Sequence, residues 1–275
     1  MINNIGIVDT RKVIKAINET YNYDFNDYAL TSFKHRLIQF INNNNYNNIE
    51  NFIQDILKNE INFEDFIDKI LIDTTEMFRT PSFWRELRDK YLPKLASNRD
   101  LKIWIPHVTS GDDLFTLEII LFELGLSNNV HITVTGMSEK KLELIKKGGE
   151  YSLKKMEVGE ANYKRYAGKF QLSNYYAVKN NYAYLDTSLI KNVSFKKGII
   201  TQDKSTSGFK LIIFQNHMIY FNQSLQDKVA ITLIDNLVPA GILALGSGET
   251  LEYSSAMNKL QVIDKLEKIY KKKIG

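Results

Sequence analysis

The chain has 275 residues, 44% of them hydrophobic and 25% charged, which is the balance of a soluble globular protein rather than a disordered or fibrous one. Its net charge of +4 is too small for the dense Lys/Arg surface of a dedicated nucleic-acid binder. The absence of cysteine excludes disulfides, thiolate metal sites and a cysteine nucleophile. Because no segment resembles a signal peptide or approaches the roughly 20 apolar residues of a membrane span, we expect a cytoplasmic protein.

The first part of the chain has the hydrophobic spacing of helices. Apolar residues recur at positions three and four apart, and no β-prone run interrupts them. We therefore predict a small all-helical domain over residues 1–95, with an asparagine-rich loop at residues 42–48. The predicted helical segments are residues 13–21, 33–41, 49–57, 63–72 and 81–93.

From residue 101 onward, β-prone runs alternate with helical patterns. The predicted strands are residues 101–105, 130–134, 209–214 and 242–245, and the predicted helices are residues 114–124, 139–147 and 225–237. This alternation predicts an α/β domain with a doubly wound, mostly parallel sheet over residues 96–275. Ligands bind beyond the carboxyl ends of the strands in such sheets, so we expect a site at the loops after Ile105, Val134 and Phe214. A tyrosine-rich stretch at residues 171–195 is expected to form a small β-hairpin excursion.

Three motifs, in order and at the right spacing, resemble those of the CheR family of chemotaxis receptor methyltransferases. Residues 75–81 read TEMFRTP and are similar to T-x-x-F-R-(D)-P. Residues 209–221 read FKLIIFQNHMIYF and resemble F-D-L-I-F-C-R-N-V-L-I-Y-F. Residues 237–251 read LVPAGILALGSGETL and resemble L-x-P-G-G-x-L-x-L-G-x-S-E-x-L. Because residues 24–37 also resemble the family's helical domain, the resemblance covers nearly the whole chain.

The resemblance implies an S-adenosylmethionine-dependent methyltransferase that modifies glutamate carboxylates of a chemoreceptor or related signalling protein. Methyl transfer from a sulfonium to a carboxylate requires alignment and water exclusion more than acid-base catalysis. By the resemblance, Arg79 and Tyr220 occupy the catalytic positions. The Arg79 guanidinium can pair with a carboxylate, and the Tyr220 hydroxyl can donate a hydrogen bond to substrate or orient the methyl donor. From the residues alone, the competing interpretations are that Arg79 forms a surface ion pair and that Tyr220 is a packed aromatic ring.

The resemblance also implies a set of cofactor-binding residues. These are Asp73, Thr75, Arg79, Gly111, Asp113, Met137, Phe214, Gln215 and Asn216. Several positions differ from the family pattern, among them four that bear on cofactor binding: Pro106 and His107 replace Ala-Gly in the loop after the first strand, Gly136 replaces the aspartate that binds the ribose, and Ile199 replaces an asparagine. A hydrogen bond to a charged acceptor contributes about 1.5–3 kcal/mol, so the exchange at Gly136 is expected to weaken cofactor binding.

Two functions are consistent with this pattern. One is an active methyltransferase, and the alternative is a family member that has lost cofactor binding and acts as a binding or scaffolding protein. Lys34, His35 and Arg36 form either a contact for an acidic partner segment, as the family's basic helix does, or a solvated helix face. No metal site is predicted, because His107 has no second histidine at ligand spacing.

Overall fold

The computed structural model describes residues 2, 4–71, 75–97, 100–202 and 207–274, and it divides into two compact units. The first unit comprises residues 1–72 and 218–226, and the second comprises residues 73–217 and 227–275. The predicted segment 81–93 is helical and its helix continues to residue 96. This segment belongs to the second unit, whereas the sequence placed it in the helical domain over residues 1–95.

The first unit is built from amphipathic helices. They are α1 (Ile7–Tyr21), α2 (Leu30–Asn43), α3 (Ile49–Leu57) and α4 (Phe63–Ile70). Their buried faces carry the apolar residues that define the predicted pattern, among them Val13, Leu37 and Phe66. Two asparagines begin helices, because the Asn48 side chain accepts a hydrogen bond at the start of α3 and the Asn62 side chain does so at the start of α4.

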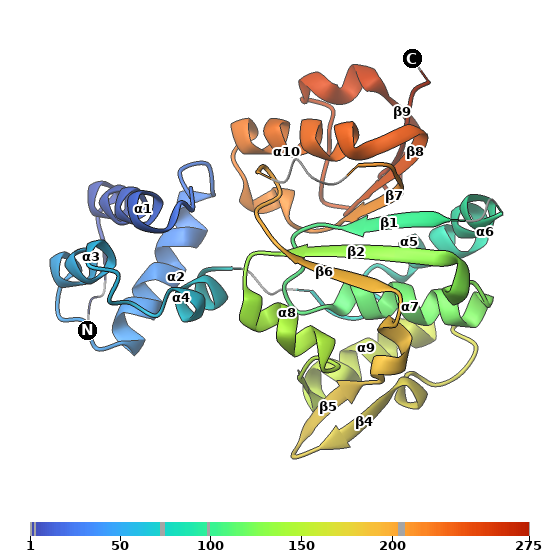
Figure 1. Cartoon of the computed structure of the whole chain (residues 1–275), viewed down its shortest axis with the longest axis horizontal. Helices are drawn as coiled ribbons and strands as arrows, with labels where there is room; N and C mark the ends of the chain where they lie inside the picture. Colours follow the sequence, from blue (N-terminus) through green and yellow to red (C-terminus); the bar gives the residue numbers. More distant parts are fainter. Residues whose placement is uncertain (1, 3, 72–74, 98–99, 203–206, 275) are drawn as a thin grey trace. The chain divides into compact units, whose positions relative to one another are not determined.

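The second unit contains a seven-stranded sheet (Figure 1). Its strands are β1 (Leu101–Ile105), β2 (Val130–Gly136), β6 (Val193–Lys197), β7 (Phe209–Phe214), β8 (Leu237–Leu245), β9 (Leu260–Asp264) and β10 (Ile269–Lys272). The order is β6-β2-β1-β7-β8-β10-β9. The first five strands are parallel to one another, and β10 is antiparallel to β8 and to β9. This confirms the predicted doubly wound, mostly parallel sheet. The strand order reverses between β1 and β7, which is where such sheets bind ligands.

Helices cover both faces of this sheet, with α7 and α8 on one face and α10 on the other (Figure 1). The helices of the second unit are α5 (Pro81–Glu86), a π-helical turn (Leu87–Tyr91), α6 (Leu92–Ala96), α7 (Asp112–Leu124), α8 (Glu139–Lys146), α9 (Leu153–Tyr166) and the greater part of α10 (Gln223–Asn236). Short 3₁₀ turns lie at Ser127–Asn129, Leu172–Tyr175, Thr187–Ile190, Met218–Tyr220 and Ser255–Lys259. Most of α7 is buried, which explains its nearly continuous apolar sequence.

Two local predictions were wrong. The sequence predicted a strand only from residue 242, but β8 begins at Leu237 and runs through Pro239-Ala240-Gly241. Ala240 takes a positive φ of 62° and the pairing with β7 shifts register there, so the strand bulges. Helix α2 continues to Asn43, so the asparagine-rich loop starts later than residue 42.

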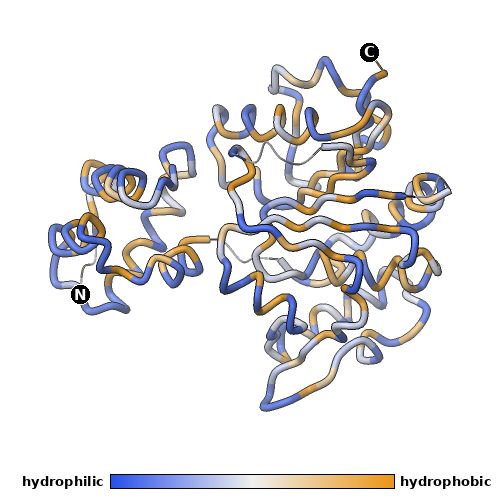
Figure 2. Tube along the Cα trace, in the orientation of Figure 1, coloured by the Kyte–Doolittle hydropathy of each residue, from blue (hydrophilic) through white to orange (hydrophobic). Residues whose placement is uncertain are grey.

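A second, three-stranded sheet lies at the predicted hairpin. Its strands are β3 (Tyr151–Ser152), β4 (Tyr176–Lys179) and β5 (Tyr182–Leu185), in the order β3-β5-β4. Hydrophobic residues follow the central strands of the large sheet, whereas the tip of the β4–β5 hairpin is hydrophilic (Figure 2). Among the described residues, none of the helices has the length and apolar character needed to span a membrane.

Candidate cofactor site

Two histidines meet at the carboxyl ends of β1 and β7. The rings of His107 and His217 are 4.7 Å apart between centroids, with an edge-to-face geometry, and each residue is only 7% exposed. Burial, assisted by the positive charge of Lys141, lowers the pKa of His107 to about 4. Burial also lowers the pKa of His217, so both imidazoles are neutral at neutral pH. His107 has a positive φ of 62°, a conformation that glycine adopts most easily.

A hydrogen-bond network fixes the loop between β1 and α7. The Asp112 Oδ2 atom accepts hydrogen bonds from the Ser110 hydroxyl, from the Thr75 hydroxyl at 3.0 Å and from the Lys155 ammonium at 2.9 Å. The Ser110 and Thr75 hydroxyls are 3.0 Å apart. The Tyr151 hydroxyl donates to the Ser110 carbonyl at 2.6 Å. The predicted cofactor residue Thr75 is thereby held against the first turn of α7.

Asp113 is a buried carboxylate within a cluster of charges. Burial and the neighbouring Asp112 raise its pKa to about 7, and Glu249 adds to this rise. The positive charges of Arg79 and Lys155 oppose it by lowering the pKa of Asp113. The structure therefore brings two predicted cofactor residues, Arg79 and Asp113, within electrostatic reach of each other. A buried acid with a raised pKa is typical of functional sites.

Glu249 links the ends of two neighbouring strands. Its Oε2 atom accepts hydrogen bonds from the backbone N–H groups of Asn216 at 2.9 Å and Gly246 at 2.7 Å, and its Oε1 atom accepts one from His217 at 2.8 Å. The residue is 3% exposed. Asn216, a predicted cofactor residue with a φ of 60°, is thus held in place by a buried carboxylate.

The remaining cofactor positions border the same strand ends. Gly111 precedes α7 with a φ of 85°, a backbone conformation that favours glycine. Met137, Phe214 and Gln215 are buried. At Gly136, an added Cβ would lie 2.9 Å from a side-chain carbon of α8 and 3.1 Å from a backbone oxygen. An aspartate at this position would therefore require its surroundings to move.

Three predictions concern residues whose roles stay open. Asp73 lies outside the described residues. Arg79 belongs to the second unit and Tyr220 to the first, so their meeting in one active site stays a prediction. Among the basic residues of α2, Arg36 donates a hydrogen bond to the Leu71 carbonyl at 3.2 Å, and the His35 ring lies 3.1 Å from the Gln39 amide.

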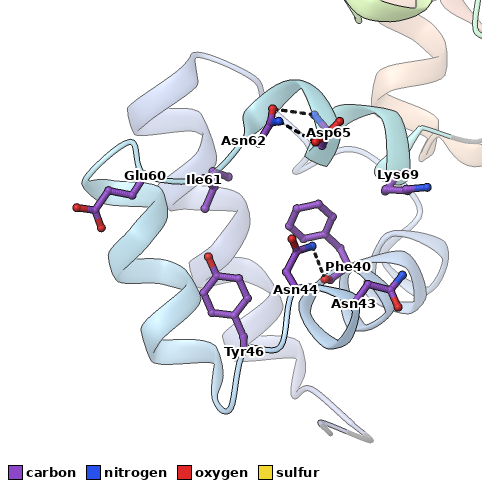
Figure 3. A pocket seen from close by; sticks show the side chains of 9 residues that line it. All are labelled: Phe40, Asn43, Asn44, Tyr46, Glu60, Ile61, Asn62, Asp65 and Lys69. Carbon is purple, nitrogen blue, oxygen red and sulfur yellow. Dashed lines mark hydrogen bonds between the residues drawn. The ribbon is translucent and has the colours of Figure 1, made fainter.

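A separate cavity of about 440 Å³ lies in the first unit (Figure 3). It is lined by Phe40, Asn43, Asn44, Tyr46, Glu60, Ile61, Asn62, Asp65 and Lys69. Several of its lining residues bond to one another: the Asn44 amide donates to the Phe40 carbonyl at 2.9 Å, and Asn62 and Asp65 exchange two hydrogen bonds. None of the predicted site residues lines it.

Sequence reasoning missed Ser110, Tyr151 and Lys155. Tyr151 and Lys155 lie in a part of the chain for which the sequence predicted no element, since α9 has only a weak apolar stripe. Glu249 stands inside the third matched motif, at its S-E position, so its place in that motif was a usable signal. Within the described part of the chain, no three His, Asp or Glu side chains are grouped so that they could hold a metal ion.

The doubly wound sheet, with a buried loop and the acidic start of α7 at its switch point, has the architecture expected of an S-adenosylmethionine-dependent methyltransferase. Residues 73–267 match the family described as CheR methyltransferase, SAM binding domain, and residues 9–71 match CheR methyltransferase, all-alpha domain. The chain therefore belongs to the CheR methyltransferase family, whose cofactor is S-adenosylmethionine.

Several curated proteins are similar along most of their length. A Pseudomonas putida protein named Cher3 is 28% identical over 96% of this chain and 97% of its own. Chemotaxis protein methyltransferases of Listeria innocua and Borreliella burgdorferi are each 24% identical; they cover 86% and 90% of this chain and 88% and 90% of their own lengths.

Solved structures resemble the chain more weakly. The N-methyltransferase NodS of Bradyrhizobium japonicum, in complex with S-adenosyl-L-homocysteine, has a TM-score of 0.34 and 13% identity, covering 62% of this chain and 63% of its own. The glycopeptide N-methyltransferase MtfA, complexed with S-adenosyl-L-methionine, has a TM-score of 0.36 and 10% identity, covering 63% and 51%. The family assignment rests on the sequence matches alone.

Proposed function

We propose that this protein transfers the methyl group of S-adenosylmethionine to glutamate side chains of a chemoreceptor or a related cytoplasmic signalling protein. Its family membership and its similarity to chemotaxis protein methyltransferases support the reaction class. The observation that carries the proposal is the buried Asp113 carboxylate, with a pKa raised to about 7, within electrostatic reach of Arg79 at the switch point of the sheet.

The charges around α7 fit the amino-acid end of the cofactor. An ammonium group placed beside Asp113 would favour the ionised carboxylate that burial disfavours. The Arg79 guanidinium can form a paired hydrogen bond with a carboxylate. Thr75, which the network through Asp112 holds in position, adds a hydroxyl next to these charges. We assign binding of the cofactor's amino-acid moiety to Asp113, Arg79 and Thr75.

The ribose end is expected to be bound more weakly than in family members that keep an aspartate there. Gly136 offers no carboxylate, and the loss of one charged hydrogen bond of about 1.5–3 kcal/mol corresponds to an affinity lower by about one to two orders of magnitude. Met137, Phe214, Gln215 and Asn216 remain as the apolar and polar residues that would surround the nucleoside. Asn216 is fixed through its backbone N–H by Glu249.

The bound cofactor would supply a methyl group activated on a positively charged sulfur. A glutamate carboxylate is already a nucleophile at neutral pH, so the protein needs no general base for the transfer. What the chain must provide is orientation of the two reactants and exclusion of water. We assign orientation of the receptor's glutamate carboxylate to Arg79 and Tyr220. We assign recognition of an acidic receptor segment to Lys34 and His35 on α2.

A second candidate function is a binding or scaffolding protein that does not transfer methyl groups. The observation that favours it is the buried histidine pair, because His107 stands at the position of a family glycine and packs against His217 at the carboxyl end of β1. The two functions predict different results in a methyl-transfer assay.

The test is a methyl-transfer assay with S-adenosylmethionine labelled in its methyl group and cytoplasmic fragments of chemoreceptors. A glutamyl methyl ester releases methanol in alkali, so alkali-labile label on the receptor fragment is the expected product. Exchange of the acceptor glutamates for aspartate should remove the label. Receptor binding without any label on the glutamates, at saturating cofactor, would favour the scaffolding function.

A further inference from the structure

We propose that Lys155 is a positioning residue for the cofactor site. It compensates the buried charge of Asp112 and thereby holds Thr75 and Ser110 at the first turn of α7. This inference rests on the proposed function, because it concerns how the same site is kept in shape. Lys155 lies on α9, far along the sequence from the motifs that carry the family resemblance.

Lys155 supplies a positive charge to the buried Asp112 carboxylate in this network. The Asp112 side chain is fully buried, with 0% exposed, while Lys155 is 24% exposed and reaches Asp112 Oδ2 at 2.9 Å. The same oxygen accepts hydrogen bonds from Ser110 and Thr75. Removal of one partner of a buried ion pair leaves an uncompensated charge, and the protein avoids it by protonation or rearrangement. Either change would alter the acceptor that orients the two hydroxyls.

The position of Lys155 is itself fixed at the start of α9. The Ser152 hydroxyl accepts a hydrogen bond from the Lys155 backbone N–H at 3.3 Å, which caps the helix. The Lys155 ammonium lies 5.4 Å from the centre of the Tyr151 ring, within cation–π range. Because the Tyr151 hydroxyl bonds to the Ser110 carbonyl, neighbouring residues of one helix start hold both the side chain and the backbone of Ser110.

Helix α9 also contacts the segment that carries Arg79. Asn162, two helical turns after Lys155 and 5% exposed, donates a hydrogen bond to the Met77 carbonyl at 3.2 Å. Beyond it, the Arg88 guanidinium donates to the Ala167 carbonyl at 3.2 Å, just after the end of α9. The helix therefore contacts the Thr75–Arg79 segment at Met77, and Lys155 contacts the loop of the cofactor site from the start of the same helix.

The experiment compares Lys155→Met with Lys154→Met in the full-length protein. Lys154 is the preceding residue of the same helix and is exposed, so its variant makes the same change in net charge on the solvent-facing side of the helix. Binding of S-adenosylhomocysteine is measured by calorimetry. Amide hydrogen exchange is measured on peptides that cover residues 75–79 and 106–113.

We expect Lys155→Met to weaken S-adenosylhomocysteine binding at least tenfold and to speed exchange in both peptides at least tenfold, with Lys154→Met within threefold of wild type in each. Lys155→Arg keeps the charge and should restore most of the affinity. Lys155→Gln keeps a hydrogen-bond donor without the charge, serves if Lys155→Met does not fold, and should lose three- to tenfold. Wild-type affinity in the folded methionine or glutamine variant, or an equal loss in Lys154→Met, would overturn the proposal.

Failure of the proposed function is distinguishable from failure of this inference. If the wild-type protein binds no S-adenosylhomocysteine, the function is refuted, and hydrogen exchange alone then decides the role of Lys155. Faster exchange confined to residues 75–79 and 106–113 in Lys155→Met supports the positioning role. Unchanged exchange there, or equally faster exchange throughout the second unit, contradicts it.

Discussion

Replacement of Glu249 by glutamine tests the carboxylate that joins the ends of β7 and β8. The carboxylate accepts three backbone hydrogen bonds, at 2.7, 2.8 and 2.9 Å, through its two oxygens. Glutamine has the same shape but offers one oxygen and an NH₂ group. If the oxygen takes the Oε2 position, the NH₂ group faces the backbone N–H of His217, so that two donors meet and one buried N–H loses its acceptor.

The expected loss follows from these contacts. A hydrogen bond to a charged acceptor contributes about 1.5–3 kcal/mol, and a buried donor without a partner costs about 1–3 kcal/mol. Both estimates include the loss of the same buried hydrogen bond, so they are not added. We expect Glu249→Gln to lower the free energy of unfolding of the second unit by about 3 kcal/mol.

Urea unfolding followed by tryptophan fluorescence measures this loss. Both tryptophans of the chain, Trp84 and Trp104, are buried in the second unit, so their emission reports on the part that contains Glu249. Glu252→Gln is the matched control, because Glu252 is exposed and its exchange should change the free energy by less than about 0.5 kcal/mol. A loss below about 1 kcal/mol in Glu249→Gln would refute the proposed role of the carboxylate.

Three further predictions concern the second unit. Burial raises the pKa of Glu118 from 4.5 to about 8, so between these pH values the folded state keeps a proton that the unfolded chain releases. The free energy of unfolding of the wild type should therefore fall relative to that of Glu118→Gln as the pH rises from 4.5 to about 8. Urea titrations should show a fall of at most about 1.4 kcal/mol per pH unit. Gly148 has a φ of 98° and its added Cβ would lie 2.4 Å from a backbone oxygen, whereas Gly125 has a φ of 69° and open space; Gly148→Ala should cost about 3 kcal/mol and Gly125→Ala about 1 kcal/mol in the free energy of unfolding. The indole N–H of Trp104 donates to the Thr135 hydroxyl at 2.9 Å in the core, so Thr135→Val should cost about 1–3 kcal/mol and change Trp104 emission; an unchanged unfolding midpoint would contradict it.

The fold was predictable where long apolar runs mark buried elements. Strand β7 is a nearly continuous apolar run and α7 is apolar on nearly all sides, and both lie where the sequence placed them. Helix α9 was not predicted, because its buried face combines one methionine, Met156, with Gly159, Asn162 and tyrosines and has no aliphatic stripe. The path of β8 through Pro239-Ala240-Gly241 was also missed, since its bulge depends on pairing with β7.

The candidate site was predictable only in part. Thr75, Arg79 and Asp113 were predicted through motif resemblance. In the structure, Thr75 bonds to Asp112, the neighbour of Asp113, and the charge of Arg79 acts on Asp113. Lys155 could not be identified from its sequence context, because a lysine near a helix start is usually solvated. Its partner lies 43 positions earlier in the chain, so only the fold brings the two together.

The most direct test of the central claim is calorimetric titration of the wild-type protein and Asp113→Asn with S-adenosylhomocysteine at several pH values. The ligand ammonium favours ionised Asp113, so wild-type affinity should rise as the pH increases through about 7, by up to tenfold per pH unit below that value. Asp113→Asn should bind at least tenfold more weakly at pH 8 and should lose this pH dependence. Absence of heat in the wild type at millimolar ligand, or identical titrations of the two proteins, would contradict the account.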